Sequence, residues 1–301
     1  MPRKTKVISK EVVPPQSDER NVGHEVPQRE PIVTEAEIWA RELLEELRAS
    51  YFTPLAWIRF LWAAFVRGHV RRRERWPAFR QLLALTLVGS GVWALVGWLS
   101  DPTLAVAGGL FWLTTMLMLD WHLGMLERPD GTVIEGLGPA NAIDVCRVGA
   151  VPALAVLSAE WLALALLIIG TLDVADGRIA RARDEVTRLG HWLDGSVDTI
   201  VLVTGAWLLV RADALPTWAG VLVSIRYLTP LVVITFWYFL AAGPPPRHGY
   251  VPGRYPGVVL LAGLLLAPFW EPAAIALVAV GALSGLATFA ATLWRSKNAP
   301  P

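Results

Sequence analysis

The 301-residue sequence has a single cysteine, Cys146, and almost no net charge. One cysteine excludes an intramolecular disulfide framework and a cysteine-based zinc site. Lysine and arginine number 27 against 26 aspartates and glutamates, so the total charge does not indicate a nucleic-acid-binding protein. An apolar segment is also missing behind the opening Met-Pro-Arg-Lys-Thr-Lys, so we expect no cleavable signal peptide.

Apolar residues are abundant. Hydrophobic residues make up 54% of the chain and charged residues only 18%, which is typical of a polytopic membrane protein. The fold class that we predict is therefore all-α. Five of the fifteen tryptophans fall near the ends of apolar runs, as in interfacial aromatic belts: Trp98, Trp161, Trp218, Trp270 and Trp294.

The chain before the first long apolar run is divided into two parts. Residues 1–33 carry scattered prolines and mixed charges, which predicts a disordered cytoplasmic tail. Residues 34–80 are predicted to form amphipathic and interfacial helices, because the apolar stretch 51–66 is too short to span a bilayer. The basic run 71–75 is expected to anchor this part at the cytoplasmic surface and to attract anionic lipid headgroups.

Eight apolar runs that we predict to be membrane helices follow. Two of them, 82–99 and 103–120, predict a transmembrane hairpin within residues 81–125. A membrane domain over 138–296 holds six more helices, predicted at about 142–158, 161–181, 190–210, 216–241, 254–269 and 272–294. Basic residues gather on one side of this arrangement, so we expect both termini in the cytoplasm of a cell whose plasma (inner) membrane holds the protein.

Four carboxylates interrupt the apolar pattern between residues 173 and 198. Asp173 and Asp176 are spaced i, i+3, and Asp194 and Asp198 are spaced i, i+4, so each pair shares a helix face. Near a bilayer centre each aspartate costs roughly 2.5–3.5 kcal/mol. Clustered oxygen ligands without histidine or cysteine favour a hard divalent cation, Mg²⁺ or Mn²⁺.

The charged stretch 182–189 separates the two pairs and suits a solvated turn, across which a helical hairpin would bring the two acidic faces together. Gly177 lets a bulky group approach the backbone closely. Arg178, Arg181 and Arg183 place positive charge beside the acids, which fits a phosphate ester.

The spacing of these residues resembles the complete signature of the CDP-alcohol phosphotransferase family. The pattern reads D-x2-D-G-x2-A-R-x8-G-x3-D-x3-D, from Asp173 through Gly190 to Asp198, and every fixed position is filled. The resemblance implies six transmembrane helices and a divalent metal site at the cytoplasmic edge of the bilayer. It also implies that an acceptor hydroxyl displaces CMP from a CDP-linked alcohol.

The resemblance further implies roles for single residues. The residues implied to hold the metal are Asp173, Asp176, Asp194 and Asp198. Asp198 would also be the general base that takes the proton from the attacking hydroxyl. The residues implied to line the CDP pocket are Asp173, Gly177, Ala180 and Arg181. CDP-diacylglycerol is the expected donor, and a homodimer is expected from the family alone.

The segment 139–147 resembles the first core helix of the family, which often opens with an asparagine, a Leu-Thr step and an arginine. Asn141 and Arg147 match and become pocket candidates, whereas Ile143 and Asp144 replace the Leu-Thr step. Asn141 is equally suited to cap the N-terminus of this helix.

Two arginines are candidates for binding the acceptor. Arg226 lies inside an apolar run, where a charge indicates a functional site or a partner carboxylate, and Arg254 starts a helix, where it could instead be an anchor. Both favour an anionic acceptor such as inositol phosphate or glycerol phosphate. Thr199 stands where many glycerol-phosphate-using members of the family carry lysine, which weakens that choice. Serine and diacylglycerol remain alternative acceptors.

Three other interpretations of the acidic pairs remain open. The arginines beside them could make them purely structural. A cation- or proton-coupled transporter also places acids inside helices. The protein could finally be an inactive membrane scaffold that works through its N-terminal region.

Overall fold

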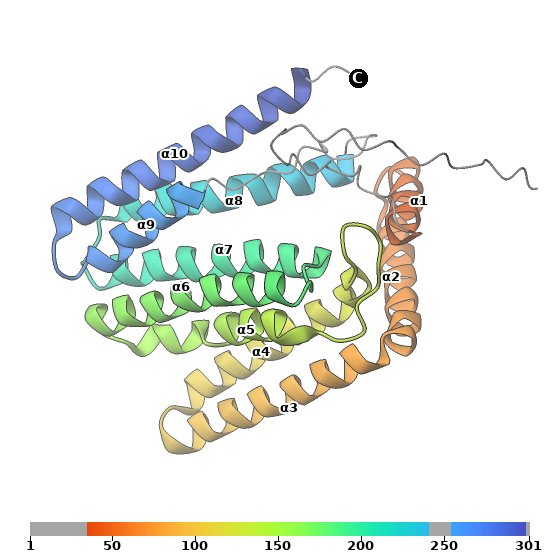
Figure 1. Ribbon diagram of the computed structural model, residues 1–301, viewed down its shortest axis with the longest axis horizontal. Helices are drawn as coiled ribbons and strands as arrows, with labels where there is room; N and C mark the ends of the chain where they lie inside the picture. The colour runs from red at the N-terminus through yellow and green to blue at the C-terminus, as the bar shows by residue number, and fades with distance from the viewer. Residues whose placement is uncertain (1–34, 241–253, 299–301) are drawn as a thin grey trace, which may run out of the picture. The chain divides into compact units, whose positions relative to one another are not determined.

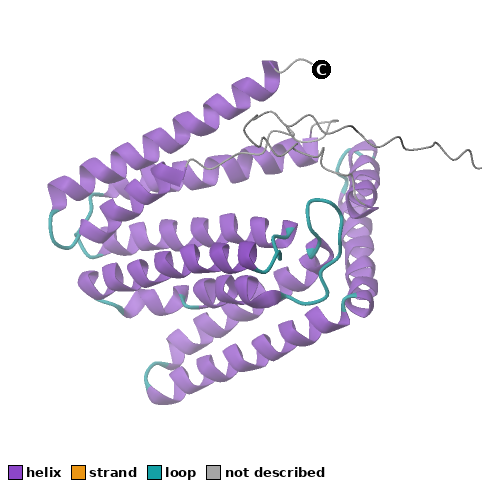
Figure 2. Ribbon diagram, viewed as in Figure 1, coloured by secondary structure: helices purple, strands orange, loops and turns teal. Residues whose placement is uncertain are grey.

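The computed structural model describes residues 35–240 and 254–298, and all ten regular elements longer than six residues in these ranges are α-helices. The predicted tail, residues 1–33, and the loop at 243–253 lie outside them. Figures 1 and 2 show the arrangement. The helices are α1 Glu35–Ala49, α2 Pro54–Glu74, α3 Trp76–Leu99, α4 Pro102–His122, α5 Gly138–Gly149, α6 Ala159–Ala182, α7 Arg188–Arg211, α8 Thr217–Leu240, α9 Arg254–Leu266 and α10 Glu271–Asn298; short 3-10 helices span Leu123–Met125 (η1) and Val151–Val156 (η2).

The predicted hairpin is formed by α3 and α4, which pack against each other. Asp101 caps α4, because its Oδ1 accepts hydrogen bonds from the backbone N–H groups of Thr103 and Leu104 at 2.7 and 3.3 Å. Trp112 of α4 is buried, and its Nε1 donates to the carbonyl of Thr86 at 3.1 Å. The indole fills the space that a side chain at Gly89 of α3 would need.

The helices α5 to α10 form the six-helix part of the molecule. Direct contacts join α5 with α6 and α7, α7 with α8, α8 with α10, α9 with α10, and α6 with both α7 and α9. The first of these helices is shorter than the predicted 142–158, since α5 ends at Gly149 and continues as the 3-10 helix η2. Pro152 explains the break, because proline lacks a backbone N–H and disfavours the α conformation of the residue before it.

Five helices in the described residues are long and apolar enough to cross a membrane: α3, α4 extended to Met125, α7, α8 and α10. This number is smaller than the eight spans predicted from the sequence. The 24-residue α6 is long enough, but Asp173, Asp176 and two arginines lie in its last ten residues. The helices α5 and α9 are shorter, with 12 and 13 residues. The reduced count therefore reflects the charged residues of α6 and the shortness of α5 and α9.

The helix α2 continues eight residues beyond the predicted interfacial stretch, through the basic run to Glu74. Large apolar side chains on it are exposed, such as Ile58 and Trp62 at 63% and 66%. It lies crosswise to α3 and α4 (Figure 1). Arg72 fixes it there, because its Nε donates to both carboxylate oxygens of the buried Asp120 of α4 at 2.8 and 2.9 Å.

The packing of α3 on α4 predicts opposite effects for two neighbouring glycines. We expect Gly89→Ala to lower the thermal unfolding temperature in detergent, because its methyl group would overlap Trp112, which the hydrogen bond to Thr86 holds in place. Overpacking typically costs about 1–3 kcal/mol. The matched control is Gly91→Ala, where the added carbon would meet nothing within 4 Å apart from its chain neighbours and the backbone of its own helix. The control should match or exceed the wild type, and equal behaviour of the two variants would contradict this account.

Candidate metal and substrate site

The acidic pairs lie on two neighbouring helices joined by a short connection. Asp173 and Asp176 are in the last turns of α6, and Asp194 and Asp198 are in the first turns of α7. Thr187 caps α7, since its Oγ1 accepts a hydrogen bond from the backbone N–H of Gly190 at 3.0 Å. This helical hairpin brings carboxylates of both pairs together.

Carboxylate oxygens from both helices are close enough to share a cation. Oxygen atoms of Asp173, Asp194 and Asp198 lie within 4.8 Å of one another. A second group with the same spacing consists of Asp144, Asp176 and Asp194. Asp194 therefore belongs to both groups, and the second group reaches a third helix, α5.

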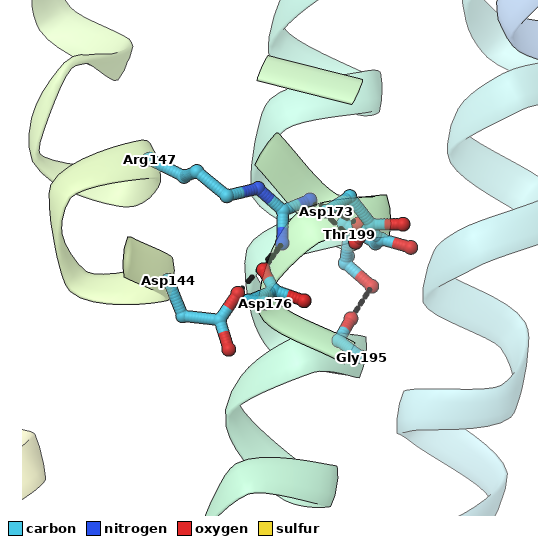
Figure 3. A network of polar contacts seen from close by, with 7 residues as sticks. Asp144, Arg147, Asp173, Asp176, Gly195 and Thr199 are labelled. Carbon is cyan, nitrogen blue, oxygen red and sulfur yellow. Dashed lines mark hydrogen bonds and ion pairs between the residues drawn. The ribbon is translucent and has the colours of Figure 1, made fainter. Parts of the chain in front are cut away.

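Arg147 of α5 lies among these acids (Figure 3). Its Nη1 is 2.6 Å from an oxygen of Asp144 and 3.1 Å from one of Asp176. Its Nη2 is 2.7 Å from Asp173 and 2.9 Å from Asp198. Only 1% of the arginine side chain is exposed. One guanidinium group thus joins carboxylates of three helices, in accordance with the planar fork of donors that arginine offers.

Asp144 is the residue of this cluster that sequence reasoning missed. We treated it as a departure from the family pattern, whereas the structure buries it at 4% exposure beside Arg147 and Asp176. The spacing could have revealed it, because Asn141, Asp144 and Arg147 are three residues apart and share one helix face.

The cluster suits a divalent cation. Its five aspartates and one arginine carry a formal charge of −4, which is costly inside a membrane protein. Asp173 Oδ1 is buried, and its contact among the described residues is the ion pair with Arg147 Nη2 at 2.7 Å, so this oxygen has capacity for a further ligand. Oxygen-only ligands match the preference of Mg²⁺ and Mn²⁺.

The smaller signature residues border this cluster. Gly177 is half-buried on α6, and a side chain there would begin 3.3 Å from Nη1 of the exposed Arg181. Ala180 is one turn from Asp176 and also half-buried. Gly177 and Ala180 therefore add little side-chain bulk to this part of α6. The guanidinium group of Arg181 lies beside Gly177.

Asn141 of α5 lies close to Gly190 of α7 and does not cap its helix. The helix α5 already begins at Gly138, and the Nδ2 of Asn141 donates to the carbonyl of Leu137 at 2.6 Å, so the N-cap interpretation is wrong. A Cβ on Gly190 of α7 would lie 2.9 Å from Asn141 Oδ1. The signature glycine therefore allows the two helices to approach closely.

The two acceptor candidates lie on later helices. Arg226 is buried at 4% exposure on α8, where its guanidinium stands 5.1 Å from the ring centre of Tyr227 and fills the space beside Gly285 of α10. Arg254 is the first residue of α9, and its side chain lies outside the described part. Thr199 follows Asp198, and its hydroxyl donates to the carbonyl of Gly195 at 2.8 Å (Figure 3).

A family model described as CDP-alcohol phosphatidyltransferase matches residues 138–294. The chain belongs to the CDP-alcohol phosphatidyltransferase family. The match begins at the first residue of α5 and includes the whole carboxylate cluster, and α1 to α4 precede it. Together with the five apolar helices, membership in this family makes the chain an integral membrane protein.

Two curated relatives have names that concern cardiolipin. The chain is 29% identical over 92 residues to the cardiolipin synthase (CMP-forming) of Streptomyces coelicolor. The aligned segment covers 31% of this chain and 39% of the relative. It is 36% identical over 83 residues to a putative cardiolipin synthase of Mycobacterium tuberculosis. This alignment covers 26% of the chain and 40% of the relative. The chain thus spans about two fifths of the length of these relatives. No solved structure matches it significantly.

The position of Arg147 predicts a stability effect that depends on divalent cations. Arg147→Gln should lower the unfolding temperature strongly in EDTA, since breaking a buried ion pair typically costs about 3–5 kcal/mol. Added Mg²⁺ or Mn²⁺ should restore more stability to the variant than to the wild type. Thermal unfolding in detergent measures both effects, with the exposed Arg178→Gln as the control. Unfolding of Arg147→Gln at the wild-type temperature in EDTA would refute this role.

Proposed function

We propose that the protein transfers the phosphatidyl group of a CDP-alcohol, with CDP-diacylglycerol as the donor, to a hydroxyl acceptor and releases CMP. The observation that carries the proposal is the meeting of the signature carboxylates of α6 and α7 within 4.8 Å in a chain of this family. A structural hairpin or a scaffold has no use for such a concentration of negative charge.

The four signature aspartates are the proposed metal ligands: Asp173, Asp176, Asp194 and Asp198. When bound, Mg²⁺ or Mn²⁺ would neutralise charge on the pyrophosphate of the donor and on the departing CMP. Nucleotide binding falls to the adjoining part of α6. Gly177 and Ala180 leave room for the nucleotide, and the exposed Arg181 offers a cation to a phosphate.

Asp198 is the proposed general base. Its side chain is 38% exposed, and its Oδ1 is held by Arg147 at 2.9 Å, so the carboxylate is both fixed and reachable. The carboxylate takes the proton of the acceptor hydroxyl as the acceptor oxygen bonds to the phosphorus that carries diacylglycerol. The bond from this phosphorus to the oxygen bridging it to the CMP phosphorus breaks, and CMP leaves with the electron pair.

An anionic acceptor agrees best with the arginines and the relatives. Formation of cardiolipin with release of CMP, as the name of the Streptomyces relative states, requires a phosphatidylglycerol acceptor, which carries a phosphate. We propose that Arg226 and Arg254 bind such a phosphate. Inositol phosphate and glycerol phosphate also carry an anionic phosphate and an acceptor hydroxyl. Thr199 in place of lysine disfavours glycerol phosphate.

The proposed orientation places the carboxylates at the cytoplasmic face of the plasma membrane, with both termini in the cytoplasm. The basic residues at 71–75 and the arginines within 178–188 support this orientation through the positive-inside rule. The exposed apolar residues of α2 support a position of that helix in the membrane interface.

The reaction is tested by CMP release from CDP-diacylglycerol with purified protein, Mg²⁺ and one acceptor at a time. We expect release that depends on a single acceptor, with phosphatidylglycerol tested first. Asp198→Asn should reduce the rate by at least about 10²-fold, which is typical for loss of a general base. The exposed Asp213→Asn, at the other end of α7, is the matched control. Absence of CMP release with every acceptor and both cations would overturn the proposed reaction.

The acceptor role of Arg226 predicts a selective kinetic defect. Arg226→Lys keeps a charge but not the fork of donors, and it should raise the acceptor KM about tenfold or more while the KM for CDP-diacylglycerol stays unchanged. Steady-state kinetics with each substrate varied in turn separates the two constants. Arg211→Lys, on α7, serves as the control. An equal change in both constants, or in neither, would remove Arg226 from the acceptor site.

A further inference from the structure

Asp144 is a member of the carboxylate cluster that the family signature does not contain. It lies on α5, outside the two signature helices, and is the most deeply buried aspartate described in this part of the molecule at 4% exposure, compared with 5% for Asp176. Its carboxylate is directed at Asp176 and Arg147 (Figure 3). The threonine that the resemblance leads us to expect at this position would carry no charge.

Arg147 alone is a poor explanation for a buried carboxylate here. The same Nη1 that contacts Asp144 at 2.6 Å also contacts Asp176 at 3.1 Å, and Nη2 contacts two more aspartates. One positive charge is therefore shared among four negative ones. A buried carboxylate without full compensation costs several kcal/mol, and like charges in contact add to that cost. An ionised Asp144 thus adds to the charge imbalance, which a bound divalent cation would offset.

We propose that Asp144 is a fifth carboxylate ligand of the metal centre and extends the centre onto α5, where it acts with Asp176 and Asp194. The carboxylate oxygens of these three residues lie within 4.8 Å of one another, as close as those of the group formed by Asp173, Asp194 and Asp198. The chemistry of the site points to a cation: five carboxylates meet there, and one guanidinium group offsets only one of their formal charges. The inference rests on the proposed function only in assuming that a divalent cation binds.

A ligand on α5 gives metal binding a structural consequence. The cation would join α5 to α6 and α7, which contact each other at this point of the six-helix part. The added negative charge should strengthen cation binding relative to a centre with a neutral residue at this position. Asp144 should therefore affect Mn²⁺ affinity itself, and the stability gained from Mn²⁺, in addition to any effect on turnover.

The test is direct Mn²⁺ binding to purified protein, measured as loss of the free Mn²⁺ signal in electron paramagnetic resonance. Asp144→Asn, which keeps the shape and removes the charge, should bind Mn²⁺ about 10–100-fold more weakly than the wild type. Asp144→Glu, which keeps a carboxylate, should recover part of the affinity. Glu160→Gln is the matched control, because Glu160 is an exposed carboxylate at the opposite end of α6 and should have no effect.

The outcomes separate this inference from the proposed function. If Asp173→Asn loses Mn²⁺ affinity and Asp144→Asn retains it, Asp144 only forms an ion pair with Arg147 and the inference is wrong. If the wild type and Asp173→Asn bind Mn²⁺ equally, the metal centre and with it the proposed function fail. If Asp144→Asn does not fold, the same measurement is made on Asp144→Thr, which has the residue typical of the family at this position. Wild-type Mn²⁺ affinity of Asp144→Thr would overturn the inference.

Discussion

The structure depends on the compensation of buried negative charge by one guanidinium group. Arg147 contacts four aspartates at 2.6–3.1 Å and is itself almost fully buried. A buried arginine and buried carboxylates are costly unless they have charged or hydrogen-bonding partners, because burial removes the water that would solvate them. This constraint requires α5, α6 and α7 to meet at one level, and it explains why the candidate site lies there.

Other features of the six-helix part allow α5, α6 and α7 to pack together around Arg147. Thr187 ends the short connection with an N-cap, so that α7 starts directly after α6 and its first turns face the last turns of α6. Gly190 leaves space for Asn141, which lets α5 approach α7. The helix α5 is short, and charged residues interrupt the apolar sequence of α6. The helices α7, α8 and α10 are long and apolar enough to cross a membrane.

The N-terminal helices form a second arrangement held by a similar pair. Arg72 of α2 binds the buried Asp120 of α4, and Trp112 locks α4 against α3. The basic end of α2 is thus attached by an ion pair to the hairpin of α3 and α4. Apolar patterning predicted both parts, but it ended the interfacial helix at residue 66. The actual helix continues to Glu74, because arginine and glutamate favour helices even where apolar residues end.

The sequence by itself determined the long helices and the two signature pairs. The run predicted at 161–181 is α6 at 159–182, and 190–210 is α7 at 188–211, since apolar runs and i, i+3 or i, i+4 spacing are local properties. The resemblance made Arg147 a pocket candidate, but only the tertiary structure decided that it contacts four aspartates and that Asp144 joins them. Arg147 is 29 residues from Asp176 and 51 from Asp198, and contacts over such separations depend on how helices pack, which no local periodicity specifies.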